Sequence, residues 1–114
     1  MNITYDNVVP LLLEVIPEFH PDPDDVTDNL VYLVFPDLMR FARLEIEHNR
    51  NKQLLERVFA FLEEVAQSQD ERVTEMLRDA LHDLAIPNPD EPRALMGPRT
   101  RRLFRKVEQE VYGR

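Results

Sequence analysis

Apolar residues recur along most of the chain with the spacing of α-helices. The clearest case is residues 52–68, KQLLERVFAFLEEVAQS, where the apolar side chains fall within an arc of about 160° at ~100° per residue. Nearly every charge lies opposite this arc, so one face is predicted to pack in the core and the other to contact water. The apolar positions are Leu54, Leu55, Val58, Phe59, Phe61, Leu62, Val65 and Ala66.

A second amphipathic helix is predicted directly afterwards. The sequence SQDE at residues 68–71 matches a capping box, with Ser68 as the N-cap and Glu71 three positions later. Because only a couple of residues separate the two helices, we expect them to fold back on each other as an antiparallel hairpin. The apolar face of the second helix comprises Val73, Met76, Leu77, Ala80, Leu81, Leu84 and Ala85.

Proline and capping signals predict three further helices. The first runs from about residue 6 to 16 and ends at Pro17. Another begins at Pro36, which suits a first helical turn because its missing N–H costs nothing there, and ends near His48. Asn51 is then a suitable N-cap for the helix that starts at residue 52. The last helix runs from 98 to 112, with Gly113 placed to cap its C-terminus.

The intervening stretches are predicted to be irregular. Residues 20–28, HPDPDDVTD, are rich in proline and aspartate and favour a loop, and residues 86–92, IPNPDEP, form a second proline break. The apolar run Val31–Phe35 is interpreted as one short buried turn leading into Pro36. No stretch alternates with the period of two that a strand requires. We therefore expect an all-α protein, one domain over residues 1–114, folded as a compact bundle of about five helices.

Composition narrows the possible functions. The chain has 114 residues, 43% of them hydrophobic, which is enough for one modest core. It has no cysteine, which excludes disulfides and thiolate metal sites and fits a cytoplasmic location. With two glycines in all, it lacks the glycine-rich loops that cradle phosphates. The N-terminal stretch has no basic region typical of a signal peptide, and no apolar run is long enough to cross a bilayer.

Charge is distributed unevenly along the sequence. Residues 1–92 carry 20 acidic and 7 basic side chains, whereas residues 93–114 carry 2 acidic and 7 basic ones, within a formal net charge of −8. An acidic body disfavours general nucleic-acid binding, because phosphates would be repelled. We expect the basic C-terminal segment to dock on the acidic body.

Glu45 and His48 have the spacing of a metal-binding pair. Glu45 falls inside the apolar arc of its helix and His48 on the edge of that arc. A di-iron bundle needs this motif twice and further glutamates, but Glu56, Glu63 and Glu64 are predicted to face solvent. We interpret Glu45 as a partly buried carboxylate paired with His48, with an arginine or with a backbone N–H. A partner-binding carboxylate and a metal-dependent enzyme are the alternatives.

The remaining candidates for chemistry are few. His20 lies in the acidic loop without the spacing of a calcium loop, and His82 is predicted on a solvated face. Ser68, the only serine, is better used as a helix cap than as a nucleophile. We therefore assign no catalytic, cofactor-binding or metal-binding residue and expect a protein that is not an enzyme.

Three segments together resemble an uncharacterised family of small acidic bacterial proteins, a domain of unknown function. These are YLVFPDLMRFARLEIEH, LLERVFAFLEEVAQSQDERVTEMLRDALHDL and LMGPRTRRLF, within roughly residues 5–110. The pair of helices at 52–85 also looks like one HEAT-type repeat, a unit that normally presents a binding surface. Small acidic helical proteins of this look are common among the immunity proteins of bacterial toxin systems, and the resemblance implies no catalytic residues.

The expected function is therefore stoichiometric protein binding, with a toxin neutralised through an acidic surface. A negative surface steers a basic partner and raises the rate of association. The alternative is a small regulator that contacts nucleic acid through the basic RTRRLFRK segment of the last helix. The candidate partner-binding residues are Asp22, Asp24, Asp25, Asp28 and Asp37, with Glu71, Glu75 and Asp79 as a second patch.

Overall fold

The computed structural model describes residues 2–113, and these fold into seven α-helices and one π-helical turn without any strand. The all-α class and the compact bundle are confirmed, although the helices are more numerous than the five expected. In chain order the elements are α1 (Val8–Val15), α2 (Pro23–Thr27), α3 (Val31–Leu44), η1 (Glu45–Asn49), α4 (Lys52–Ala66), α5 (Glu71–Ala85), α6 (Asp90–Leu95) and α7 (Pro98–Tyr112).

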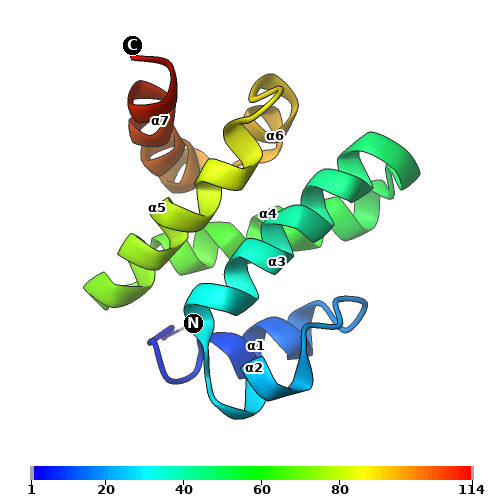
Figure 1. Ribbon diagram of the computed structural model, residues 1–114, viewed down its shortest axis with the longest axis vertical. Helices are drawn as coiled ribbons and strands as arrows, with labels where there is room; N and C mark the ends of the chain where they lie inside the picture. Colours follow the sequence, from blue (N-terminus) through cyan, green and yellow to red (C-terminus); the bar gives the residue numbers. More distant parts are fainter. Residues whose placement is uncertain (1, 114) are drawn as a thin grey trace.

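The long helix α5 lies at the centre of the helix packing. α5 packs most extensively against α3 on one side and α7 on the other, and it also contacts α4. Figure 1 shows α1 and α2 at one end of the long axis, and α6 and α7 toward the opposite end. The molecule measures 37 × 32 × 23 Å along its principal axes. The two ends are therefore separate surfaces on either side of a shared core.

The apolar faces predicted for α4 and α5 lie in this core. Seven of the eight apolar positions predicted for α4 are buried, as are all seven predicted for α5. The two helices are joined by a short turn, as expected, but α5 packs more extensively against α3 and α7 than against α4. The HEAT-like pair is thus embedded in a bundle instead of forming one layer of a solenoid.

The interpretation of Val31–Phe35 as a short turn is wrong. These residues form the first turns of α3, and Pro36 lies inside the helix rather than at its start. Proline removes one backbone hydrogen bond in a helix interior, but burial of the helix face against the core outweighs that loss. Only part of the run is buried, because the side chains of Tyr32 and Leu33 are 58% and 43% exposed.

Two segments predicted to be irregular contain short helices. In the acidic loop, α2 begins with Asp22 as N-cap, whose Oδ1 accepts a hydrogen bond of 2.9 Å from the Asp24 N–H, followed by Pro23 at the first helical position. In the second proline break, α6 starts after Asn88, whose Oδ1 accepts from the Asp90 N–H over 3.0 Å. The start of α2 is thus an ordinary side-chain cap, whereas at α6 the N-cap is Pro89 and the side chain of Asn88, one residue earlier, bonds to the first turn.

The predicted cap of α4 is confirmed, whereas that of α5 is wrong. Asn51 Oδ1 accepts from the Leu54 N–H over 3.1 Å. The N-cap of α5 is Asp70, which accepts from the Arg72 N–H, and not Ser68. Ser68 instead accepts from the Asp70 N–H and donates its hydroxyl to the Ile3 carbonyl over 2.6 Å. Its hydroxyl therefore ties the N-terminal segment to the turn between α4 and α5.

The start of α7 is held by Glu63 of α4, which the sequence placed on a solvent face. The Glu63 carboxylate accepts the Arg99 N–H, the Thr100 N–H and the Thr100 hydroxyl at 3.0, 3.0 and 2.8 Å. Partial burial opposes ionisation of Glu63, but these hydrogen bonds outweigh it and lower the pKa of the carboxyl. Gly97 makes room for the contact, since a Cβ there would lie 2.6 Å from the Glu63 carboxyl group.

Among residues 2–113, none of the helices combines the length and the apolar character that crossing a bilayer requires.

Candidate protein-binding surface

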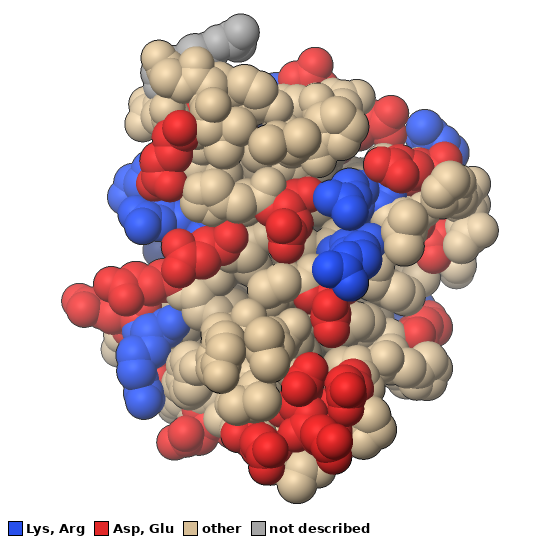
Figure 2. Space-filling view, in the orientation of Figure 1, with Lys and Arg blue, Asp and Glu red and all other residues tan. Residues whose placement is uncertain are grey.

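Five predicted carboxylates come together at the end of the molecule formed by α2 and the start of α3. Figure 2 shows a dense gathering of acidic side chains at its lower edge, where Figure 1 places α2. α2 packs directly on α3, which brings Asp37 of α3 to the aspartates of the α2 segment. In the part of the chain that the structure describes, the one cation within 4 Å of these carboxylates is Arg40, 3.4 Å from Asp37. We call this set the acidic group: Asp22, Asp24, Asp25, Asp28 and Asp37.

Within the acidic group, the pKa of the Asp25 carboxyl lies above its ordinary value. Partial burial raises the pKa of the Asp25 carboxyl, and the negative charges of the four other members raise it further. The fold therefore holds Asp25 where its ionised form is unfavourable. Such an arrangement weakens the folded state, which is typical of a surface whose charge serves binding rather than stability.

Replacing Asp25 by asparagine is expected to raise the melting temperature at pH 7. A carboxyl whose folded pKa is raised loses favourable free energy as the pH rises through that pKa, and the amide removes this loss. Below the ordinary aspartate pKa of about 3.9 the carboxyl is protonated in both states, so variant and wild type should then converge. Thermal unfolding followed by circular dichroism at both pH values checks this.

Glu56→Gln, which removes an exposed charge from α4, is the matched control for Asp25→Asn. It should change the melting temperature little at either pH. Equal stabilisation by both substitutions would show that overall net charge, and not the local cluster, sets the effect.

The second predicted patch forms a row on the exposed side of α5. Glu71, Glu75 and Asp79 follow one another at intervals of four residues and are all exposed. Two of them, Glu75 and Asp79, border an open groove between α5 and the beginning of α3. The groove is lined by Tyr5, Tyr32, Pro36, Arg72, Glu75, Met76, Asp79 and Ala80. We call Glu71, Glu75 and Asp79 the acidic row.

The exposed start of α3 separates the two acidic sets. Tyr32 and Pro36 line the groove beside the acidic row, while Asp37 belongs to the acidic group. Leu33, one helical turn before Asp37, is 43% exposed, so apolar and aromatic surface lies between the charges. Protein interfaces are often enriched in tyrosine at their centre and in polar residues around it, and this surface has the same arrangement. The structure thus brings both predicted patches to one surface with an aromatic residue between them.

Arg72 and Tyr5 fix one wall of the groove. The Arg72 guanidinium lies 5.0 Å from the centre of the Tyr5 ring and donates to the Asp70 carboxylate. Asp70 also accepts the Tyr5 N–H over 3.0 Å. Its contacts with Arg72 and Tyr5 lower the pKa of the Asp70 carboxyl. Sequence reasoning missed this wall, because its parts are far apart along the chain.

Glu45 is buried as predicted, with 7% of its surface exposed, and of the three partners predicted for it the structure shows the backbone N–H and not His48. The π-helical turn of η1 is wider than an α-helical turn and moves His48 away from the face of Glu45. His48 is exposed and its nearby carboxylate is Glu47, 3.9 Å away. Glu45 instead accepts the Asn51 N–H over 3.3 Å, and its carbonyl accepts the Arg50 N–H over 2.7 Å. Its role is to hold the junction between η1 and α4.

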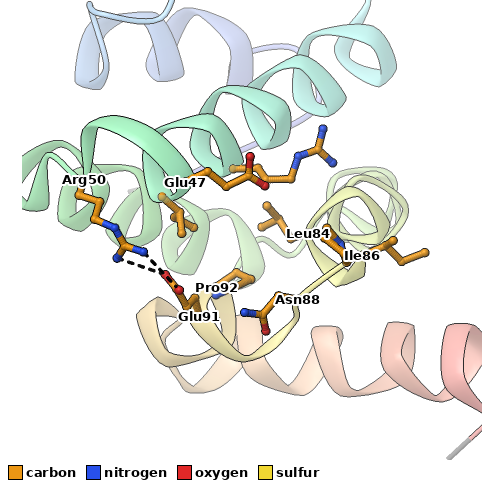
Figure 3. A pocket seen from close by; sticks show the side chains of 10 residues that line it. Glu47, Arg50, Leu84, Ile86, Asn88, Glu91 and Pro92 are labelled. Atoms are coloured by element: carbon orange, nitrogen blue, oxygen red, sulfur yellow. Dashed lines mark hydrogen bonds and ion pairs between the residues drawn. The ribbon is translucent and has the colours of Figure 1, made fainter.

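A depression of about 220 Å³ lies beside η1, between the end of α5 and α6 (Figure 3). Ile46, Leu84 and Pro92 contribute apolar surface to it, and Arg50 and Glu91 form an ion pair of 3.4 Å at its edge. Arg43 donates to the Asp83 carbonyl over 3.0 Å. Because Arg50 and Arg43 already have partners, neither arginine of the depression is free to select one kind of ligand. We therefore place the candidate site on the acidic surface.

The two other histidines, His82 and His20, do not form a site for chemistry. His82, expected to be solvated, lies 3.0 Å from Glu110 of α7 through its Nε2. His20 borders a shallow hollow beside Phe19 and Pro21. Across residues 2–113 no three histidine, aspartate or glutamate side chains are arranged to hold a metal ion.

Comparison with protein families gives the class of the protein. The model of the family described as "Domain of unknown function (DUF7674)" matches residues 9–112, so the chain belongs to this family. Neither the curated proteins nor the solved structures gave a match. The family assignment agrees with the resemblance noted from the sequence but carries no activity with it.

Proposed function

We propose that this protein is a non-enzymatic binding protein, an immunity protein that covers a cognate basic toxin in the cytoplasm. The observation that carries the proposal is the surface formed by the acidic group, the acidic row and the exposed Tyr32 between them. Clustered carboxylates cost stability when no partner is present, and a basic partner would neutralise them. Such a surface also steers a basic protein toward itself, which shortens the time in which a toxin acts.

The chemistry of the surface supports neutralisation by coverage rather than by reaction. Figure 2 shows acidic side chains gathered on an open face, and Tyr32 is 58% exposed at the groove beside the acidic row, so a protein of complementary charge has access to both. An exposed tyrosine provides a rigid, amphipathic anchor at low entropic cost. The proposed complex therefore contains one copy of each partner, with the basic surface of the toxin against the acidic group.

Co-expression tests the proposal. The chain is produced together with the product of the neighbouring gene, and growth and co-purification are measured. We expect wild type to restore growth and to co-purify with that product in equal amounts. Failure of both would reject the immunity function.

A charge-matched pair of variants locates the interface. We expect substitution by the corresponding amides at Asp22, Asp24, Asp25 and Asp28 to abolish the rescue. The same number of charges removed elsewhere, at Glu14, Glu47, Glu56 and Asp83, all exposed, should leave it intact. Equal loss in both variants would place the interface away from the acidic group.

A further inference from the structure

The basic C-terminal helix packs on the body, as expected, but its basic side chains form no ion pairs with the carboxylates of the described residues. α7 packs through buried Phe104 and Val107, and Thr100 is buried at its start. Its cations are exposed, and in the described part of the chain none of them lies within 4 Å of a carboxylate in an ion pair. We call them the basic face: Arg99, Arg101, Arg102, Arg105 and Lys106.

Most of the polar contacts that hold α7 come from its carboxylates and its two ends. Glu108 pairs with Arg93, and Glu110 pairs with His82 and, at 3.8 Å, with Arg78. The Tyr112 hydroxyl donates to the Ala85 carbonyl, and Glu63 caps the start of the helix. Arg101 donates to the carbonyls of Arg93 and Ala94, over 3.2 and 3.5 Å, and stays exposed. α7 is thus fixed along its whole length, while the side chains of Arg99, Arg102, Arg105 and Lys106 are exposed and in no ion pair with a carboxylate of the described residues. A rigid helix presents charges without the entropic cost of ordering them on binding.

We propose that the basic face binds the phosphate backbone of double-stranded nucleic acid without regard to sequence. From residue 99 to residue 106 an α-helix rises about 10 Å. A duplex carries one negative charge for about every 1.7 Å of its axis, so roughly six phosphates lie opposite that length. Four of the five cations are arginines, whose planar guanidinium groups match phosphate geometry with two hydrogen bonds.

The net negative charge of the chain does not oppose this contact at physiological salt. Figure 1 shows α7 near one end of the long axis and α2, with the acidic group, at the other, in a molecule 37 Å long. Interactions between exposed charges fall off over about 8 Å at physiological ionic strength. The acidic group therefore contributes little to the potential near α7, and the nearby carboxylates of Glu108 and Glu110 are paired with Arg93, His82 and Arg78. The acidic body of residues 1–92 disfavours nucleic acid over most of the surface, whereas the local charge of α7 favours it.

The same geometry limits what the face can recognise. Phe104 is buried, and Tyr112, 40% exposed, is held through its hydroxyl six residues beyond the last cation of the basic face, so the basic face itself offers no ring for stacking on unpaired bases. Without stacking, single strands gain only the charge contribution. Duplex binding is therefore expected to be tighter than binding to a single strand of the same charge.

The experiment measures binding of a short labelled DNA duplex by fluorescence anisotropy between about 20 and 200 mM salt. With five cations engaged, the logarithm of the binding constant should fall against the logarithm of salt with a slope of about −4 to −5. The triple variant R102Q/R105Q/K106Q should give a slope of about −2 and bind at least tenfold more weakly at low salt. A matched control, R40Q/R50Q/K52Q, removes the same charge elsewhere and should behave as wild type.

Two further probes separate the alternatives. A duplex RNA should bind with a similar slope, since both polymers offer the same phosphates. Polyglutamate that binds as tightly as the duplex would overturn the proposal in favour of an acidic protein partner. No binding at the lowest salt, or an equal loss of affinity in both triple variants, would also overturn it.

Discussion

Replacing Glu63 by alanine is expected to lower the free energy of unfolding by about 2 to 3 kcal/mol. The carboxylate satisfies two N–H groups at the start of α7 and the hydroxyl of Thr100, which is fully buried. Removing it leaves that hydroxyl without its partner in the core and removes the charge that favours a helix N-terminus. Because ionisation strengthens these bonds, the pKa of Glu63 is lowered. Its contribution should therefore fade as the pH falls below the ordinary glutamate pKa and through the lowered one.

Gly97→Ala provides the matching test of the same contact. The added Cβ would meet the Glu63 carboxyl group at 2.6 Å and push it from its hydrogen bonds, so we expect a cost of about 1 to 3 kcal/mol. In the Glu63→Ala background the methyl group meets no obstacle from that side chain, and the same substitution should be nearly neutral. A double-mutant cycle by urea denaturation measures the coupling. Additive costs would mean that Glu63 and Gly97 act independently.

Replacing Tyr32 by alanine is expected to weaken partner binding about 30-fold, or about 2 kcal/mol, the size typical of an interface hot spot. The side chain is 58% exposed and lies between the acidic group and the acidic row, so it is placed to insert into a partner surface. Stability should change by less than about 0.5 kcal/mol, because little of the ring is buried. Titration calorimetry with the co-purified partner measures the affinity, and thermal unfolding measures the stability.

The controls for Tyr32 use its own ring and another exposed residue. Tyr32→Phe keeps the aromatic surface and should retain most of the affinity. Ile86→Ala removes a side chain of similar exposure, 55%, beside the depression near η1 and should have no effect. Loss of affinity in Ile86→Ala but not in Tyr32→Ala would move the interface to that depression.

The helices with one apolar face could be predicted from sequence because their burial follows periodicity alone. α4, α5 and α7 obey this rule, and Asn51 and Gly113 cap α4 and α7 as predicted. α3 also carried the signal, since Val31, Val34, Phe35, Leu38, Met39 and Ala42 repeat at helical spacing through Pro36. Pro36 does not start the helix as predicted, because the hydrogen bond that it removes contributes little free energy compared with the burial of a whole helix face.

The site was predictable only where its residues are close in sequence. The aspartates of residues 22–28 had to be near one another, but Asp37 joins them only because α2 packs on α3. Glu45 bonds to a backbone N–H, one of its predicted partners, and not to His48, because a π-helical turn changes which side chains share a face. Glu63 lies on the mostly polar face of α4 and was therefore predicted to contact water, but it bonds to the start of α7. Helical periodicity does not reveal a contact between residues that are 36 or 37 positions apart in the sequence.

The central claim is that the acidic surface captures a basic protein. Its most direct test is the association rate between the purified chain and the product of the neighbouring gene, measured by stopped flow as salt is raised. Electrostatic steering predicts a rate constant above about 10⁷ M⁻¹s⁻¹ at low salt that falls at least tenfold toward high salt. A rate that does not depend on salt, or the absence of any complex, would contradict the account.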